Sequence, residues 1–565
     1  MPTISLSYRD YRDLIELVGR ELSADELAEY LFLLKCEVEY SDLDSEEEFE
    51  LYVEVTSDRP DMLSVEGLAR ALKGILEVEV GIPKYNVIDT EHVVHVEKSV
   101  NTIRPYIAIA IIDNVHLTDY TLRQLMQFQE KLHTTWCRNR RKASIGIYDL
   151  DKIDFPLVYK CEEPAKIRFI PLDKDSVMNA HEILAKTDQG VKYGHLIRDK
   201  PLYPLLLDAN GVVLSMPPIV NSEDTKVTVD TRRLLIDVTG TDLKTVLSVL
   251  DILSTNIAER GFKIGRVRVE NVNILTPVLR VEEIIADTIF INQVTGLPLK
   301  SEDIVTLLKK ARFDAEVLEK MKIKVIVPPY RVDILHPVDI AEDVAIAYGF
   351  NRITPELPQV FTIGRELPIS ILIRHIRDIM TGLGFTEVLN YIMTNREILF
   401  KLSLIPEEPV VEVENPKSLA YVILRSTLIP GLLAFLHQNK HVAYPHKIFE
   451  VGDVVKVDYS AENRTRQYKM LGIAISDYSV GYEDIASVVL SLLSNIGLKE
   501  VKLREIRYPF LINGRAAEIL VNNESLGYMG EVSPRVLVNF ELENPVAVAE
   551  LSISKILSLI KNVEG

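Results

Sequence analysis

Cysteine is scarce in this sequence of 565 residues: only Cys36, Cys137 and Cys161 occur, and no two of them form a C-x-x-C pair. Three cysteines cannot build a disulfide scaffold or a structural zinc site, so we expect a reducing compartment. No apolar run approaches the roughly 18 residues needed to span a bilayer. The N-terminus lacks the basic stretch and apolar core of a secretory signal. We therefore expect a cytoplasmic protein without a membrane segment.

Compact catalytic motifs are missing as well. The sequence contains no G-x-x-x-x-G-K-[ST], no H-E-x-x-H and no G-x-S-x-G, so the familiar nucleotide-binding loops and the familiar serine and metal hydrolases gain no support. Basic residues are in deficit, with 64 Lys and Arg against 83 Asp and Glu and a formal charge of −19. This excludes a surface that is basic all over, but not a local basic patch that binds nucleic acid.

The composition, with 47% hydrophobic and 26% charged residues, is typical of a folded α+β protein with about three or four domains. The hydrophobic patterns predict four parts. They are a small α/β domain over 1–100, a mixed α/β domain over 101–275, a module over 276–356 and a large antiparallel α+β domain over 357–565. In the third part the order of helix, hairpin and helix suggests a winged-helix-like module.

Apolar runs and turn residues predict individual elements. Strands are expected at 106–112, 225–229, 234–238 and 410–413, a helix at 242–258, and a hairpin turn at Asn522–Asn523.

A basic segment stands out against the acidic background. Between Lys131 and Tyr148 there are five Lys or Arg and no Asp or Glu, and the only tryptophan, Trp136, lies beside Arg138, Arg140 and Arg141. Arginine offers a planar fork to phosphate, and an aromatic ring can stack on a base. The segment is either a nucleic-acid contact or a solvated surface loop.

Four carboxylates, Asp333, Asp339, Glu342 and Asp343, surround the start of a helix predicted from Pro337. Oxygen ligands without Cys or His suit a hard cation such as magnesium or calcium. Acidic residues at a helix N-terminus are also stabilised by the helix dipole without any metal. Both interpretations stay open on these residues alone.

Asp237 and Thr239 lie two positions apart in an expected strand, so they share one face. This small polar pair at the end of an apolar strand, which follows the segment 215–222 along the chain, could line a pocket. The alternative is turn and capping chemistry, with a turn at Gly240 and a helix cap at Asp242.

Seven segments, taken in order, resemble the archaeal type of phenylalanyl-tRNA synthetase β subunits, and the resemblance covers nearly the whole chain. They are 59–70 (RPDMLSVEGLAR), 140–149 (RRKASIGIYD), 216–221 (MPPIVN), 237–241 (DVTGT), 329–334 (PYRVDI), 424–433 (LRSTLIPGLL) and 449–453 (FEVGD). The inserted oligonucleotide-binding fold and the C-terminal anticodon-binding domain of the bacterial type are not visible.

The resemblance implies an α2β2 heterotetramer that uses ATP to attach phenylalanine to tRNA(Phe), with charging carried out by the α subunit. The part over 357–565 would be a catalytically inactive class II synthetase core that forms an interface with α. The carboxylates Asp333, Asp339, Glu342 and Asp343 match the spacing of a magnesium site that the family shares with its α subunit.

The resemblance also makes the part over 101–275 an editing domain, which hydrolyses tyrosine mischarged on tRNA(Phe). Asp237, Thr239 and Ser215 are then the expected editing residues, and a bound water is the expected nucleophile. Leu205 and Asn221 would contact the substrate, while Arg138, Arg140 and Arg141 would guide the acceptor end of the tRNA. Two other hypotheses remain: a non-catalytic scaffold with an inactive editing pocket, and a free-standing nucleic-acid-binding regulator.

Overall fold

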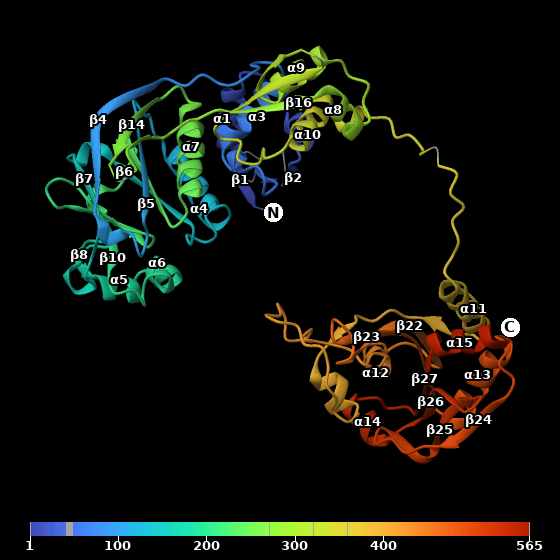
Figure 1. Cartoon of the computed structure of the whole chain (residues 1–565). Coiled ribbons are helices and arrows are strands. Elements are labelled where there is room, and N and C mark those ends of the chain that lie inside the picture. Colours follow the sequence, from blue (N-terminus) through green and yellow to red (C-terminus); the bar gives the residue numbers. More distant parts are fainter. Residues whose placement is uncertain (1, 41–48, 271, 320, 359, 564–565) are drawn as a thin grey trace. The chain divides into compact units, whose positions relative to one another are not determined.

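The computed structural model describes residues 2–40, 49–270, 272–319, 321–358 and 360–563 (Figure 1). The chain forms two compact units, Met1–Leu357 and Pro358–Gly565. Among the described residues, no helix is long and apolar enough to cross a membrane.

The first unit begins with a three-stranded antiparallel sheet in the order β1-β3-β2. Its elements are β1 (Thr3–Ser7), α1 (Tyr8–Val18), α2 (Ala24–Leu33), β2 (Glu37–Tyr40), β3 (Glu50–Glu54) and α3 (Val65–Ile75). Side chains define the helix starts: the backbone N–H of Ser23 donates to Glu26, and the backbone N–H of Glu26 donates to Ser23 Oγ. Such reciprocal bonds satisfy N–H groups that have no partner inside the helix.

A ten-stranded sheet follows, in the order β12-β11-β10-β7-β4-β14-β5-β13-β6, with β15 paired to β14. The strands are β4 (Val87–Val96), β5 (Tyr106–Asp113), β6 (Ala143–Asp149), β7 (Leu157–Glu162), β10 (Tyr203–Leu207), β11 (Val213–Met216), β12 (Val220–Asn221), β13 (Arg233–Gly240), β14 (Lys263–Val269) and β15 (Ile274–Thr276). A two-stranded sheet joins β8 (Arg168–Phe169) and β9 (Met178–Asn179). The helices are α4 (Asp119–Thr134), α5 (Ala180–Lys186), α6 (Asp188–Tyr193) and α7 (Leu243–Ala258).

Two sequence expectations differ from this sheet. The predicted boundary at residue 100 follows β4, yet β4 pairs with β14 and β7 inside the large sheet. The strand predicted at 225–229 is wrong: a 3-10 helix spans Glu223–Thr225, and the chain then turns. There the Thr231 hydroxyl accepts from the backbone N–H of Thr228, and such local side-chain bonds compete with strand pairing.

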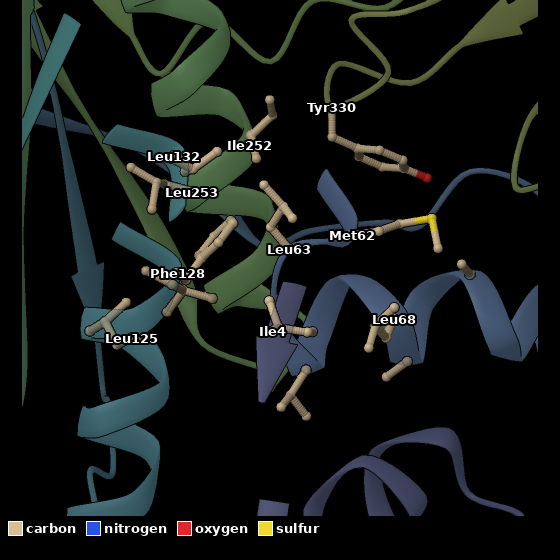
Figure 2. Packing of buried hydrophobic residues seen from close by; sticks show 14 of the residues in the cluster. Ile4, Met62, Leu63, Leu68, Leu125, Phe128, Leu132, Ile252, Leu253 and Tyr330 are labelled. Atoms are coloured by element: carbon tan, nitrogen blue, oxygen red, sulfur yellow. The ribbon is translucent and has the colours of Figure 1, made fainter. Parts of the chain in front are cut away.

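One hydrophobic core joins distant parts of this unit. Figure 2 shows Leu63, which precedes α3, beside Phe128 of α4 and Leu253 of α7. Leu68 of α3 lies farther along the same cluster, and Tyr330 from the following module lies at its margin. Helix α7 also packs on β5 and β13. The strand that carries Asp237 is therefore held from behind by a tightly packed helix.

The last part of the first unit confirms the expected hairpin and helix. Strand β16 (Glu282–Asp287) pairs with β18 (Lys322–Val327), which pairs with β17 (Asp314–Val317). The helices are α8 (Thr288–Thr295), α9 (Ser301–Lys310) and α10 (Pro337–Tyr348).

A buried ionic network ties α3 to its surroundings. Asp61 is fully buried and accepts two bonds of 2.9 Å from Arg59 and one of 3.3 Å from Arg70. The Arg70 guanidinium lies 3.6 Å above the centre of the Tyr330 ring and 3.5 Å from Glu259. Burial raises the pKa of Asp61, but Arg59 and Arg70 lower it further, to about 2. The carboxylate is therefore charged at neutral pH.

The second unit is built on a seven-stranded sheet in the order β19-β22-β23-β27-β26-β25-β24, antiparallel except for the β19–β22 pair. Its strands are β19 (Thr386–Glu387), β22 (His446–Val457), β23 (Thr465–Ser476), β24 (Val501–Glu505), β25 (Leu511–Val521), β26 (Glu524–Val532) and β27 (Val546–Ser552). A short pair, β20 (Met393–Thr394) and β21 (Ile423–Leu424), stands apart. The helices are α11 (Pro368–Gly382), α12 (Ile429–Gln438), α13 (Tyr482–Asn495), α14 (Pro534–Asn539) and α15 (Ile553–Val563).

In this unit the hairpin turn predicted at Asn522–Asn523 is confirmed. It joins β25 to β26, with φ of 51° and 63°, which asparagine tolerates better than most residues. The strand predicted at 410–413 is wrong, because Glu412 makes only an isolated bridge to Ile423. Pro409 and Pro416 bracket this segment, and proline removes backbone donors that a strand needs.

Candidate editing site

Strands β6 and β13 form the floor of the candidate site. They pair so that Gly146 lies opposite Asp237 and Ser144 opposite Thr239. Because side chains alternate along a strand, Ser144, Gly146 and Tyr148 share one face of β6, and Asp237 and Thr239 share the same face of β13. A polar row is thus built into an otherwise apolar sheet.

The other wall comes from the far end of the strand order. Ser215 on β11 pairs with Asn221 on β12. The Tyr148 hydroxyl oxygen lies 2.8 Å from Ser215 Oγ, and Asn221 Nδ2 donates to the carbonyl of Ile147 over 3.3 Å. Since β6 and β12 end the strand order on opposite sides, these bonds show that the sheet curls until its two edges meet. The site lies at this closure.

A small hollow lies at the closure, with a volume of about 20 Å³. Asp237, Tyr148, Ser215 and Asn221 line it. A space of this size with polar walls suits one ordered water molecule. A second hollow of about 340 Å³ shares five of the lining residues. The shared residues are Arg140, Ile145, Ile219, Val220 and Asn221.

The carboxyl group of Asp237 is poised to exchange a proton near neutral pH. Its side chain is 2% exposed, and burial raises its pKa to about 7, although a hydrogen bond from the Tyr148 hydroxyl and the charge of Arg104 act to lower it. A buried carboxyl with a pKa near the working pH suits general base catalysis. Asp237 can therefore take a proton from a water molecule in the small hollow.

Thr239 and Leu205, both expected in the pocket, do not line the small hollow. The Thr239 hydroxyl accepts from Nε of buried Arg104 at 3.0 Å and lies 3.1 Å from Ser144 Oγ. Leu205 is buried in an apolar cluster that also contains Met216 and Ile219. In this structure Thr239 anchors Arg104, and Leu205 supports the β11–β12 hairpin; their roles toward a substrate stay predictions.

The three arginines of the basic segment differ in their surroundings. Arg138 and Arg141 are exposed. Arg140 is half-buried: its guanidinium donates to the carbonyls of Pro218 and Ile219 at 3.2 and 2.9 Å and lies 4.2 Å from the Tyr193 ring centre. Arg140 thus clamps the β11–β12 hairpin over the site, while Arg138 and Arg141 face solvent.

Known proteins match along the whole chain. Residues 284–350 match the tRNA synthetase B5 domain, and residues 353–553 match the CLM domain of the phenylalanyl tRNA synthetase beta chain. Over 560 residues the chain is 43% identical to the phenylalanine–tRNA ligase beta subunit of Korarchaeum cryptofilum, with 98% of each chain covered. The chain belongs to the family of phenylalanine–tRNA ligase β subunits. This confirms the resemblance found in the motifs.

Two further relatives support this family membership. The beta subunit of Methanocaldococcus jannaschii is 41% identical over 556 residues, covering 98% of this chain and 100% of its own. The crystal structure of an N-terminal fragment of the Pyrococcus horikoshii β subunit is 40% identical, with a TM-score of 0.58. It covers 61% of this chain and 99% of that fragment.

The carboxylates predicted to form the family's magnesium site are already engaged in this β subunit. Arg331 donates to Asp333 at 2.7 Å and to Asp343 at 2.6 Å, while Asp339 caps α10 by accepting from the backbone N–H groups of Leu335 and His336. Glu342 pairs with Lys35 at 2.9 Å. In the described parts of the chain, no group of three or more His, Cys, Asp or Glu could hold a metal ion. The set as placed does not fit a cation.

The sequence motifs did not indicate three residues of the candidate site: Arg104, Gly146 and Tyr148. Tyr148 and Gly146 lie in the segment 140–149 that carried the resemblance, and strand alternation alone places them on one face with Ser144. That alternation was a usable signal. Arg104 lies before β5, and nothing local to it points to Thr239, which is 135 positions away.

Gly146 leaves the space in which Tyr148 and Asp237 meet. A Cβ atom at this position would overlap the Tyr148 hydroxyl and Asp237 Oδ1. Replacing Gly146 with alanine is expected to displace both groups. If the site hydrolyses Tyr-tRNA as the resemblance implies, this hydrolysis should slow about 10²-fold, because small misplacements of reacting groups are costly. Single-turnover deacylation measures this rate, and phenylalanine charging by the same preparation should be unchanged. A wild-type deacylation rate would contradict the placement of the site.

Proposed function

We propose that the chain is the β subunit of an α2β2 phenylalanine–tRNA ligase that acts on tRNA(Phe) in the cytoplasm. The α subunit would activate phenylalanine with ATP and charge the tRNA. The unit Pro358–Gly565 would be a class II synthetase core without catalysis and would contact α. Its antiparallel sheet is compatible with such a core. The sequence after Phe449–Gly452 contains no Gly-rich strand and helix with the ATP-binding arginine of that class.

The ten-stranded sheet would carry a second activity, hydrolysis of tyrosine mischarged on tRNA(Phe). The observation that carries this proposal is the buried Asp237 carboxyl, with a pKa of about 7, on the wall of a water-sized hollow. The adjoining hollow of about 340 Å³ falls within the range of about 300–1,000 Å³ usual for small ligands. It would hold the tyrosyl group, and Asn221 lines both hollows.

The reaction uses groups of this chain and one water molecule. The oxygen of the water molecule attacks the ester carbonyl carbon, and Asp237 takes a proton from that water molecule. The bond from that carbon to the ribose oxygen of the tRNA breaks, and the ribose oxygen recovers the proton from Asp237. The products are free tyrosine and uncharged tRNA. The magnesium prediction remains a prediction, and no step passes through a cation.

Selection of tyrosine over phenylalanine needs such a second site. An apolar synthetic pocket rejects a near-isostere with one extra hydroxyl by only about 10²-fold. A pocket that offers polar partners to the phenol would reverse the preference, because phenylalanine leaves them unpaired at a cost of about 1–3 kcal/mol. The larger hollow contains the polar side chains of Gln129, Gln189, Asp173 and Lys226. Any of these could pair with the phenol, and Arg138 and Arg141 could receive the tRNA phosphates.

The test uses the chain purified with its α partner. We expect the complex to release tyrosine from Tyr-tRNA(Phe) much faster than phenylalanine from Phe-tRNA(Phe), while charging tRNA(Phe) with phenylalanine. If the complex charges tRNA but leaves the lifetime of Tyr-tRNA(Phe) unchanged, the chain is a scaffold with an inactive pocket. A chain that elutes alone as a stable monomer and never binds α would support a free-standing regulator.

A further inference from the structure

A tyrosine of the chain itself occupies the centre of the candidate site. Tyr148 is 1% exposed, and its hydroxyl contacts both Asp237 Oδ1 and Ser215 Oγ. Its ring packs in an apolar cluster with residues of β5, β7 and β14, among them Ile109, Tyr159 and Val267. The ring therefore has no room to leave, and its hydroxyl position is set by the core of the domain.

A phenol has one proton, so it cannot donate to both neighbours. The carboxylate is the stronger acceptor, because hydrogen bonds to charged groups are about twice as strong as neutral ones. Burial raises the pKa of Tyr148 well above its ordinary value, so the phenol keeps its proton. The bonds therefore run in one direction: Ser215 donates to the Tyr148 oxygen, and Tyr148 donates to Asp237 Oδ1.

This chain of bonds leaves the second carboxylate oxygen available. Among the described residues, none donates a hydrogen bond to Asp237 Oδ2, and the side chain lines the water-sized hollow. We infer that Tyr148 is a positioning residue for hydrolysis: by holding Asp237 Oδ1, it directs Oδ2 at the water and stabilises the ionised carboxylate. The inference rests on the proposed editing function.

The groups that face Asp237 come from several elements. Tyr148 lies on β6, Arg104 precedes β5, and Tyr159 lies on β7. Arg104 favours the ionised carboxylate, but it is bonded to Thr239, Ser144 and the carbonyl of Arg140. Tyr148 is thus the one group among the described residues that donates directly to the Asp237 carboxylate.

Replacing Tyr148 with phenylalanine keeps the ring and removes the donor. With the α partner present, we expect the rate of Tyr-tRNA hydrolysis at pH 7 to fall about tenfold with little change in KM, because the tyrosyl group binds in the other hollow. The pH at which the rate reaches half its maximum should rise by about one unit, because the ionised carboxylate loses a hydrogen bond. A purely structural effect would lower the rate without moving this inflection.

Tyr203→Phe is the matched control. Tyr203 is as buried as Tyr148, and its hydroxyl donates to the carbonyl of Arg198 instead of Asp237. It should leave both the rate and the inflection unchanged. Ser215→Ala, which removes the far end of the bonded chain, should move the inflection in the same direction by less. If Tyr148→Phe does not fold, the inflection measured for Ser215→Ala tests whether Tyr148 positions Asp237.

The outcomes distinguish the proposed editing function from the positioning role of Tyr148. If the wild-type complex does not hydrolyse Tyr-tRNA(Phe), the proposed function fails. If it does, and Tyr148→Phe keeps the wild-type inflection, the positioning role is overturned while the function stands. If Tyr148→Phe is unfolded, an unshifted inflection in Ser215→Ala overturns the role in the same way.

Discussion

Replacing Asp237 with asparagine is expected to slow the hydrolysis of Tyr-tRNA(Phe) by about 10²–10⁴-fold, the usual contribution of a general base. The amide keeps the shape of the side chain but cannot accept the proton of the attacking water. In the wild-type complex the rate should rise between about pH 6 and pH 8, because the ionised fraction of a carboxyl with a pKa of about 7 grows over this range. Rapid-quench deacylation across this range measures both effects.

Asp251 provides a close control for this experiment. It is a second buried carboxyl of the same unit, and burial also raises its pKa to about 7. It lies on α7 and accepts from the backbone N–H of Leu279 over 3.2 Å, away from the hollow. Asp251→Asn should keep the wild-type rate and inflection. A wild-type rate in Asp237→Asn would disprove the assignment of the base, although membership in the family would stand.

The second large effect concerns stability. Replacing Asp61 with asparagine should lower the free energy of unfolding of the first unit by about 3–5 kcal/mol, because two buried guanidinium groups lose the carboxylate that neutralises them. The only tryptophan of the chain, Trp136, packs against the core of this unit. Urea unfolding of the whole chain, followed by tryptophan fluorescence, therefore reports the first unit selectively.

The matched control is Asp89→Asn. Asp89 also pairs with an arginine, Arg266, but its side chain is 56% exposed. A surface ion pair contributes about 0–1 kcal/mol, so this variant should unfold near the wild-type urea concentration. If Asp61→Asn and Asp89→Asn lowered the free energy of unfolding equally, the buried network around Asp61 would contribute no more stability than a surface ion pair, and this prediction would be wrong.

Much of the fold could be predicted from local patterns. The asparagine turn before β26 and helix α10 were correctly expected, because each depends on a few neighbouring residues. The strand predicted at 225–229 is wrong because apolar periodicity contains no information on local side-chain hydrogen bonds. The strand predicted at 410–413 is wrong because prolines on both sides of it remove backbone donors. The membership of β4 in the large sheet depends on pairing with β14, about 175 positions later, which no local pattern contains.

By itself, the sequence determined the family of the chain and the face that Asp237 shares with Thr239, since motif order and strand alternation are local properties. Only the tertiary structure decided what that face does. Curling of the sheet brings Ser215 from one edge to Tyr148 on the other, and Arg104 reaches across to occupy Thr239. The same holds for the carboxylates near α10: the fold places Arg331 between Asp333 and Asp343, a partner that their spacing did not indicate. Burial and long-range pairing set these partners, and both exist only once the chain has folded.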